Sequence, residues 1–203
     1  MGRRLAGKLV LATHNNGKLS EFKALMAPYG VDVVSVGQLG LPVPEETGTT
    51  FVENARIKAL AALEATGLPA IADDSGLCIE ALDGAPGVYT ADWSGPTRDW
   101  DVAMQKAQDE LLAVGATEPA RRRGSFVSVL TVVWPDGHSE TFEGRAEGTL
   151  VWPTRGGHGH GYDPMFQPDG SDKTFAEMTE AQKNTISHRA RSFQKLADAC
   201  LKD

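Results

Sequence analysis

Two neighbouring carboxylates, Asp73 and Asp74, stand directly after the short apolar run Ala70-Ile71-Ala72. This pattern predicts a buried strand that ends in Asp73-Asp74-Ser75-Gly76, and ligands of open α/β sheets bind at the carboxyl ends of strands. Adjacent carboxylates repel each other unless one is solvated, one keeps a proton, or a divalent cation neutralises them. The tetrad therefore indicates a general base or a metal site, although the same residues are also good turn formers.

A candidate phosphate site lies at the first predicted strand–helix junction. The apolar run Leu9-Val10-Leu11-Ala12 leads into Thr13-His14-Asn15-Asn16-Gly17-Lys18 and then into a helical pattern. Backbone N–H groups at a helix start and the positive end of the helix dipole attract anions, and Lys18 adds a full charge. The spacing is not that of a P-loop. A plain turn, with Asn15 and Gly17 as turn formers and Lys18 solvated, is the alternative interpretation.

Polar residues in two other segments could complete such a site. Glu45-Glu46 would add oxygen ligands if their loop folds over the same strand end, and otherwise they form a solvated acidic loop. The segment His160-Gly161-Tyr162-Asp163 offers an imidazole, a phenol and a carboxylate that can stack on a base and bond its edge. Lys183 and the pair His188-Arg189 flank the start of the last predicted helix, where they are either solvated or ligand-binding. A phosphate site beside a carboxylate cluster suggests Mg²⁺ bridging to a polyphosphate.

The elements that must position these residues alternate between strand and helix patterns. Apolar periodicity predicts helices over 19–29, 50–67, 101–114 and 179–201, and strands over 9–12, 31–36, 70–72, 125–134 and 140–142. Thr50 and Glu53 have the form of a capping box, and Pro135-Asp136-Gly137 predicts a hairpin turn. In the third helix the predicted inward positions are Val102, Met104, Ala107, Leu111 and Leu112. Antiparallel strands beside βα units predict a mixed sheet.

Composition excludes several classes of protein. The 203 residues are 41% hydrophobic and 23% charged, so the chain can bury a substantial core, and we expect a single domain over 1–203. The formal net charge of −7 argues against binding to nucleic acid polymers or to anionic membranes, and favours a small nucleotide as the phosphate ligand. No window of the sequence approaches a membrane span. Cys78 and Cys200 lack ligand spacing, and we expect free thiols in a reducing cytosol rather than a disulfide or a zinc site.

Taken together, these segments resemble the inosine triphosphatase family, the pyrophosphatases of non-canonical purine nucleoside triphosphates. The resemblance runs from Leu9 to about Leu196 and is specific because five blocks occur in order. The blocks are Thr13-x-Asn15-x-x-Lys18; Glu45-Glu46-Thr47-Gly48 leading to Phe51-x-Glu53-Asn54-Ala55; Ala72-Asp73-Asp74-Ser75-Gly76-Leu77; Gly161-Tyr162-Asp163-Pro164; and Lys183-x-x-x-Ser187-His188-Arg189.

The resemblance implies an enzyme that hydrolyses dITP, ITP and XTP between the α- and β-phosphates with Mg²⁺, giving the monophosphate and pyrophosphate. It implies an elongated α/β fold with a central mixed twisted sheet, flanking helices, two lobes and a nucleotide cleft between them. It also implies a homodimer, and the free thiols expected above predict a cytoplasmic location. Asp74, with Asp73 beside it, would act in catalysis, and Asp74, Glu45 and Glu46 would hold the metal. The implied substrate-binding residues are Thr13, His14, Asn15, Asn16, Gly17, Lys18, Lys58, Ser75, His160, Gly161, Tyr162, Asp163, Lys183, His188 and Arg189.

One departure from the family pattern concerns base binding. The family most often has phenylalanine before Gly161-Tyr162-Asp163, and this chain has His160. An imidazole stacks more weakly on a purine, and it titrates. Two rival functions stay open: a pyrophosphatase of pyrimidine or modified nucleotides, and a nucleotide-binding regulatory module without turnover. The segment from Lys183 to Arg189 argues against the first rival, and the Asp73-Asp74 pair argues against the second.

Overall fold

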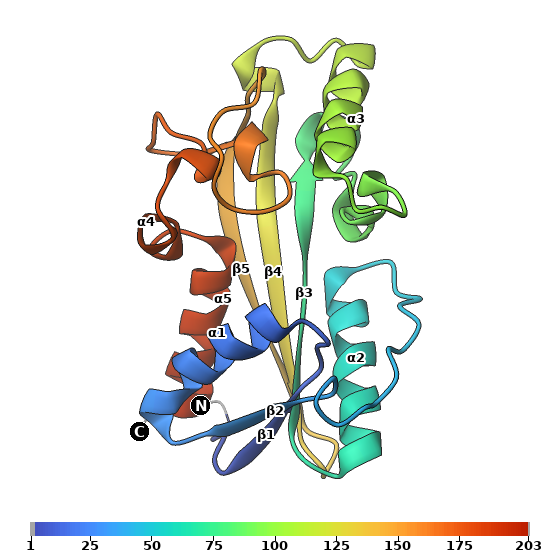
Figure 1. Cartoon of the computed structure of the whole chain (residues 1–203), viewed down its shortest axis with the longest axis vertical. Helices are drawn as coiled ribbons and strands as arrows, with labels where there is room; N and C mark the ends of the chain where they lie inside the picture. Colours follow the sequence, from blue (N-terminus) through green and yellow to red (C-terminus); the bar gives the residue numbers. More distant parts are fainter. Residues whose placement is uncertain (1–2, 203) are drawn as a thin grey trace. The chain divides into compact units, whose positions relative to one another are not determined.

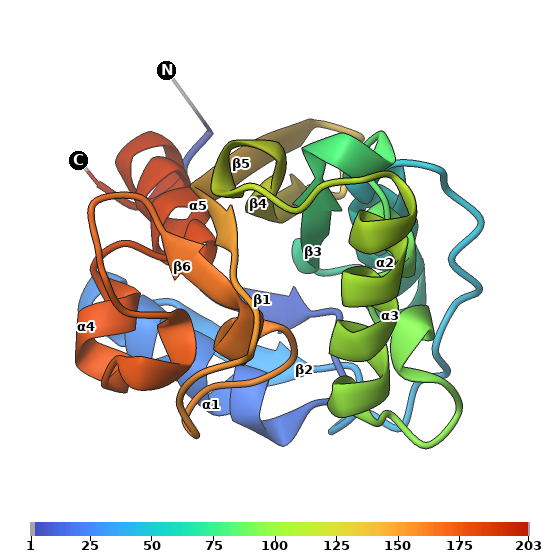
Figure 2. The ribbon, with the colours of Figure 1, turned by 90° about the horizontal axis from the view of Figure 1, so that it is seen from above.

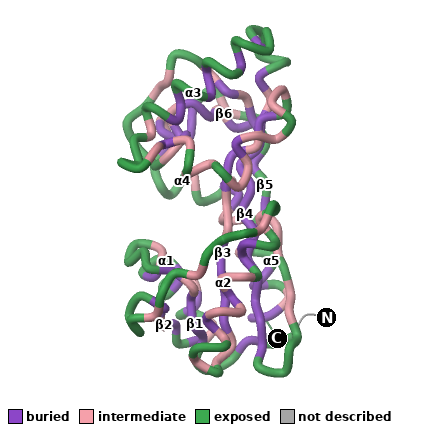
Figure 3. Tube along the Cα trace, turned by 90° about the vertical axis from the view of Figure 1, so that its right-hand side faces the viewer, coloured by how far each residue is buried: buried purple, intermediate pink, exposed green. Residues whose placement is uncertain are grey.

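The computed structural model describes residues 3–202 and contains a six-stranded sheet in the order β2-β1-β3-β4-β5-β6. Strand β1 is parallel to both β2 and β3, whereas β6 is antiparallel to β5, so the sheet is mixed, as predicted. The strands are β1 (Lys8–Leu11), β2 (Asp32–Ser35), β3 (Ala70–Ile79), β4 (Arg123–Val133), β5 (Ser139–Leu150) and β6 (Phe166–Pro168). In Figure 3 the buried residues follow these strands.

The chain divides into two compact units. Unit 1 comprises Met1–Asp74, Val129–Glu143 and Ser192–Asp203. Unit 2 comprises Ser75–Ser128 and Gly144–Arg191. Strands β3, β4 and β5 each contribute residues to both units. Each unit has a hydrophobic core of its own.

In unit 1, helices α1 (Asn16–Met26) and α2 (Phe51–Thr66) pack on opposite faces of the sheet (Figure 1). Successive side chains of a strand point to opposite faces, and β1 follows this rule. Leu9 and Leu11 pack with α1, whereas Val10 packs with the alanines of α2. The sheet in this unit is therefore buried on both sides.

The predicted start and stop signals position these two helices. Thr50 and Glu53 form the predicted capping box of α2, and Gly67 ends the helix at φ 69°. Helix α1 starts earlier than the apolar periodicity predicted, at Asn16 instead of Leu19. The reason is that Asn15 caps the helix, so its first turn is polar.

The predicted end of the third strand is wrong. Strand β3 runs without interruption from Ala70 to Ile79, so Asp73 and Asp74 lie within the strand and not in a turn after it. Strand β1 pairs with β3 only as far as Leu11 opposite Ile71. Beyond that pair β3 continues because β4 lies along its other edge. The two carboxylates consequently lie just past the carboxyl end of β1.

In unit 2, helix α3 (Trp100–Ala113) lies on one side of the strands, and the short helix α4 (Glu180–Asn184) lies on the other side (Figures 1 and 2). The buried face of α3 consists of Ala103, Met104, Ala107, Gln108 and Leu111. Val102 and Leu112, predicted to face inward, are 52% and 50% exposed. Those two predictions are wrong because the buried face is centred one residue away from the apolar stripe that the sequence suggested.

The last predicted helix is interrupted. Helix α4 ends at Asn184, and α5 (His188–Leu196) begins after a turn in which the Ser187 hydroxyl accepts a hydrogen bond from the Ala190 amide (3.1 Å). The hairpin after β4 is present, but its second strand, β5, is much longer than the predicted 140–142. Both cysteines are free thiols. Among residues 3–202, no helix is long and apolar enough to cross a membrane.

Candidate active site

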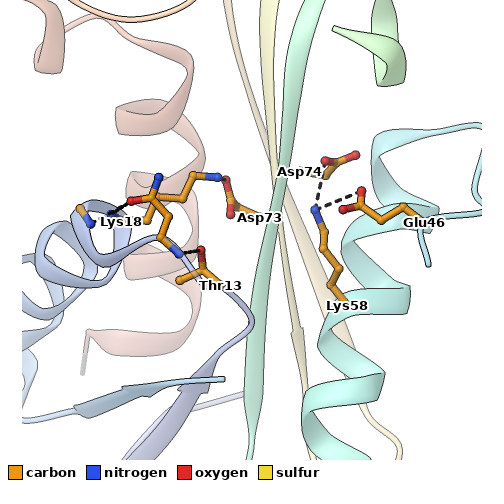
Figure 4. Close-up of polar contacts among 8 residues, drawn as sticks. Thr13, Lys18, Glu46, Lys58, Asp73 and Asp74 are labelled. Carbon is orange, nitrogen blue, oxygen red and sulfur yellow. Dashed lines mark hydrogen bonds and ion pairs between the residues drawn. The ribbon is translucent and has the colours of Figure 1, made fainter. Parts of the chain in front are cut away.

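Asp73 and Asp74 point to opposite faces of β3, and each contacts a different lysine (Figure 4). The Asp73 carboxylate accepts a hydrogen bond from Lys18 Nζ of α1 (2.7 Å). The Asp74 carboxylate accepts one from Lys58 Nζ of α2 (3.1 Å). Strand alternation separates the two carboxylates, so they do not form one doubly charged site as their adjacency in the sequence suggested.

The loop before α1 is held by its own side chains. Asn15 Oδ1 accepts hydrogen bonds from the backbone N–H groups of Gly17 (2.8 Å) and Lys18 (3.1 Å). These are two of the amides that we expected to be free for phosphate, and the capping role of Asn15 occupies them. Thr13 is buried, and its hydroxyl accepts from the Asn15 amide (3.2 Å). The ammonium of Lys18 is thus the strongest anion-binding group of this segment.

Two other residues of the same loop have different surroundings. Asn16 is exposed at the first position of α1. His14 lies 2.7 Å from the backbone carbonyl of Leu41 through Nε2, which must therefore donate the hydrogen bond. His14 consequently ties the start of α1 to the loop that precedes the acidic pair, and we expect it to position that loop.

On the other face of β3, Lys58, Asp74 and Glu46 form what we call the Lys58 cluster. Lys58 Nζ lies 3.1 Å from Asp74 Oδ1 and 3.3 Å from Glu46 Oε2. The side chains of Lys58 and Asp74 are each 14% exposed and that of Glu46 is 37% exposed. Of the acidic pair it is Glu46 that reaches the cluster, through its contact with Lys58.

Burial dominates the electrostatics of Asp74. It raises the pKa of the carboxyl group from 3.8 to about 6, and Lys58 only partly opposes this effect while Glu46 and Asp73 add to it. Burial also disfavours the charge of Lys58, but the carboxylates of Asp74, Asp73 and Glu46 raise the pKa of Lys58 above its ordinary value. A carboxyl group that titrates near neutrality is suited to act as a general base.

The loop that carries Glu46 is anchored on the first turn of α2. The buried side chain of Asn54 accepts a hydrogen bond from the Gly48 amide (2.8 Å) through Oδ1. Glu53 Oε2 accepts from the amides of Thr49 (2.8 Å) and Thr50 (3.0 Å). We did not identify Asn54 as a functional residue from the sequence, although it is part of the second family block. Asn54 is buried on α2 together with Ala55, Ala59 and Ala62, and a polar residue among these small apolar ones was the available signal.

The residues of the Lys58 cluster fit the implied magnesium ion. Asp74 Oδ2 is buried and accepts no hydrogen bond from any side chain or backbone group of residues 3–202. No three His, Cys, Asp or Glu side chains are grouped to hold a metal within the described part of the chain, so Glu45, Glu46 and Asp74 are not assembled into a protein-only site. Magnesium commonly binds one or two carboxylates together with substrate phosphates and water, which matches Asp74 and Glu46.

In unit 2, His160, Asp163 and Lys183 form a second group, which we call the Asp163 cluster. Asp163 is 2% exposed, and its Oδ2 accepts from the His160 amide (2.7 Å) and from Lys183 Nζ (2.5 Å). Gly159 is required beside this cluster because a Cβ there would lie 2.1 Å from Asp163 Oδ2. The carboxylate therefore fixes both the loop and the lysine.

The aromatic residues of this loop differ in exposure. Tyr162 is 1% exposed, and its hydroxyl donates to the Thr90 carbonyl (3.1 Å), so the phenol is not presented to solvent as the sequence suggested. The His160 ring is exposed and lies edge-on to Trp100, with ring centroids 5.0 Å apart. Trp100 also contacts Tyr162. We did not predict Trp100 as part of this site because it lies about 60 residues before the loop, outside the family blocks.

The pair His188-Arg189 opens α5. His188 is buried and stacks on Phe126, with ring centroids 5.0 Å apart and the planes inclined by 16°. Arg189 is half-buried, as are Ser75 of β3 and Gly161. The structure thus brings His160, Asp163 and Lys183 together around one carboxylate and places Phe126 under His188.

Comparison with known proteins identifies the family. The model of the Ham1 family matches residues 9–199. The chain belongs to the Ham1 family. The matched range includes both the Lys58 cluster and the Asp163 cluster.

Curated relatives in the Ham1 family cover nearly the whole chain. The chain is 56% identical to a dITP/XTP pyrophosphatase of Bradyrhizobium diazoefficiens, with 99% of each sequence covered. It is 58% identical to a dITP/XTP pyrophosphatase of Ruegeria pomeroyi, over 95% of this chain and 94% of the relative.

Solved structures agree. A HAM1 protein from Coxiella burnetii is 37% identical, with a TM-score of 0.89 over 94% of this chain and 96% of that one. A nucleoside-triphosphatase / dITP/XTP pyrophosphatase from Mycobacterium abscessus is 38% identical, with a TM-score of 0.79 over 93% of this chain and 98% of that one. The α/β fold with a mixed sheet is therefore the Ham1 fold.

Proposed function

We propose that this Ham1 protein hydrolyses dITP, XTP and ITP between the α- and β-phosphates and releases the monophosphate and pyrophosphate. The observation that carries the proposal is the buried Asp74 carboxylate, whose Oδ2 accepts no hydrogen bond from the described residues and whose pKa is raised to about 6. The names of the curated relatives support the substrate class.

Asp74 acts as the general base in the proposed reaction. Its Oδ2 accepts a proton from a water molecule while the water oxygen bonds to the α-phosphorus. The bond between that phosphorus and the bridging oxygen breaks, and pyrophosphate leaves. Lys58 and Lys18 provide positive charge for the phosphates, on the two faces of β3.

Magnesium, when held by Asp74 and Glu46 together with the phosphates, supplies further charge neutralisation. Removal of the metal with a chelator is therefore expected to stop the release of pyrophosphate.

The base is bound in our proposal by residues of unit 2. His160 offers an exposed ring, Lys183 and Arg189 offer cationic donors, and Asp163 holds Lys183 in place. A site that hydrogen-bonds a 6-oxo purine discriminates against adenine because a 6-amino group leaves the donors of the site unpaired. Thr13, His14, Asn15, Asn16, Gly17, Ser75 and Gly161 complete the proposed substrate-binding set. The buried side chains of Tyr162 and His188 contribute by holding the loop and the helix that carry other members of the set.

At the level of the whole molecule we propose a single catalytic domain over 1–203 that forms a homodimer in the cytoplasm and acts on free nucleotides. The net charge of −7 supports a small substrate in place of a nucleic acid polymer. Sedimentation velocity would test the dimer: we expect a species of twice the chain's mass, and a monomer at micromolar concentration would contradict it.

The experiment that tests the function measures pyrophosphate release from dITP, XTP, dATP, dGTP and dUTP, each with Mg²⁺ and with a chelator. We expect release from dITP and XTP only when the metal is present. Preferential turnover of dUTP would support the pyrimidine rival. Nucleotide binding without pyrophosphate release under any condition would support the regulatory module.

A further inference from the structure

Lys58 lies between the two carboxylates that we propose as magnesium ligands (Figure 4). Its ammonium is 3.1 Å from Asp74 Oδ1 and 3.3 Å from Glu46 Oε2, so one nitrogen contacts both side chains. Lysine carries a single positive charge with three donors and no acceptor. The ammonium contacts Oδ1 of Asp74 and leaves Oδ2 without a hydrogen-bond donor from residues 3–202, so it partly neutralises the same two carboxylate groups that would hold a divalent cation.

The Lys58 ammonium is held between two carboxylates. The side chain of Lys58 is 14% exposed, and its nitrogen contacts both Asp74 and Glu46. Lys58 also lines a cavity of about 120 Å³, whose other walls include Ala12, Val36, Leu41, Pro44 and Ala62. There is therefore empty space beside Lys58 on this face of β3.

We propose that Lys58 is the resident counter-ion of the nucleotide-free site, which keeps the affinity of Asp74 and Glu46 for divalent cations low until a triphosphate attracts the ammonium away. The proposal rests on the proposed function for its substrate. An ammonium and a divalent cation bound to the same two carboxylate groups lie close together, and like charges at short distance repel. Phosphate oxygens give the ammonium an alternative anionic partner, so nucleotide and metal binding become coupled.

The test measures Mn²⁺ binding to the nucleotide-free protein by electron paramagnetic resonance, since Mn²⁺ and Mg²⁺ both suit carboxylate ligands. The variants are Lys58→Met, which keeps an apolar stem without charge, and Lys58→Arg, which keeps the charge. Lys18→Met is the matched control because Lys18 pairs with Asp73 on the other face of β3. Thermal unfolding checks that each variant folds, and Lys58→Gln replaces Lys58→Met if that variant does not.

We expect Lys58→Met to bind Mn²⁺ about tenfold or more tightly than wild type, in the range by which one adjacent charge shifts an ionic equilibrium. Lys58→Arg and Lys18→Met should stay close to wild type. In the presence of a chelator, Lys58→Met should bind dITP more weakly, and this opposite effect would not follow from a purely structural role.

Equal or weaker Mn²⁺ binding by folded Lys58→Met would overturn the inference. If wild type releases pyrophosphate from dITP while Lys58→Met shows no gain in Mn²⁺ affinity, only the counter-ion role fails. If wild type releases no pyrophosphate, the proposed function fails whatever the Mn²⁺ titration shows. The two results are therefore separable.

Discussion

At the scale of single residues, Asp73 and Asp74 show how one strand position changes the chemistry of a carboxylate. Asp73 faces α1 and pairs with Lys18, whose side chain is 30% exposed. Asp74 faces α2, keeps one oxygen without a hydrogen-bond donor among the described residues, and has a raised pKa. Of the two adjacent residues, Asp74 has the surroundings of a general base.

Replacement of Asp74 by Asn should separate activity from stability. Asn keeps the shape of the side chain but loses its basicity, so turnover of dITP at saturating Mg²⁺ should fall by at least about 10²-fold. Because the pKa of Asp74 in the folded protein lies above its unfolded value, the ionised carboxylate destabilises the fold above about pH 6. Asp74→Asn should therefore raise the free energy of unfolding at pH 8, by up to about 3 kcal/mol.

The gain in stability should disappear between about pH 6 and pH 4, because there the wild-type folded protein takes up the proton that relieves Asp74. Urea titrations of both proteins at pH 8 and pH 4 measure the difference. A variant that retains more than a tenth of wild-type turnover, or that is destabilised at pH 8, contradicts this account of Asp74.

Replacement of Arg189 by Ala should reduce base selectivity. A lost hydrogen bond from a charged donor is worth about 1.5–3 kcal/mol, so kcat/KM for dITP and XTP should fall roughly ten- to a hundredfold. The value for dATP, which has a 6-amino group in place of the 6-oxo group, should change much less. Arg191→Ala is the matched control, since Arg191 is exposed on the same helix and donates to the backbone carbonyl of Arg145. A uniform loss across all three nucleotides would argue against base reading by Arg189.

At the scale of elements, α2 contributes to the site in two ways. Its third turn carries Lys58, and its first turn anchors the loop with Glu46 through Asn54 and Glu53. The cap that starts the helix therefore also fixes the acidic loop. A change at the contact between loop and helix should act on the Lys58 cluster without touching its residues.

Gly48→Ala tests this coupling. A Cβ at Gly48 would lie 2.6 Å from both Asn54 Oδ1 and Glu53 Cβ, so the loop must move away from α2. We expect turnover of dITP to fall about tenfold, with a higher Mg²⁺ requirement because Glu46 is displaced. Gly157→Ala is the control, since a Cβ there meets no atom within 4 Å. Wild-type metal dependence in folded Gly48→Ala would show that the loop position does not matter.

At the scale of the whole molecule, strands β3, β4 and β5 connect the two units, because each strand contributes residues to both. A strand that is part of two cores is not expected to unfold in one core alone. This continuity supports our prediction that the chain behaves as one domain.

Equilibrium unfolding in urea checks the prediction. We expect the far-ultraviolet circular dichroism and the tryptophan fluorescence to change in one coincident transition. The tryptophan fluorescence reports on both cores, since Trp134 belongs to unit 1 whereas Trp93 and Trp100 belong to unit 2. Two separated transitions would show that the units are independent domains.

The sequence by itself determined the local features and the family. Caps such as Thr50 with Glu53, the glycine at the end of α2 and the turn after β4 depend on neighbouring residues, so they can be predicted from the chain alone. The five ordered blocks predicted the family because they preserve the chemical groups of the site. These predictions needed no knowledge of which elements pack together.

Only the tertiary structure decided which side chains meet. Pairing with β4 extends β3 through Asp73 and Asp74, and strand alternation then sends the two carboxylates to opposite helices. Packing in unit 2 buries Tyr162 and brings Trp100 to His160. Glu46 contacts Lys58 from a loop that the hydrogen bond from the Gly48 amide to Asn54 anchors on α2. Each outcome depends on contacts between residues distant in sequence or on strand pairing, which a local pattern does not encode.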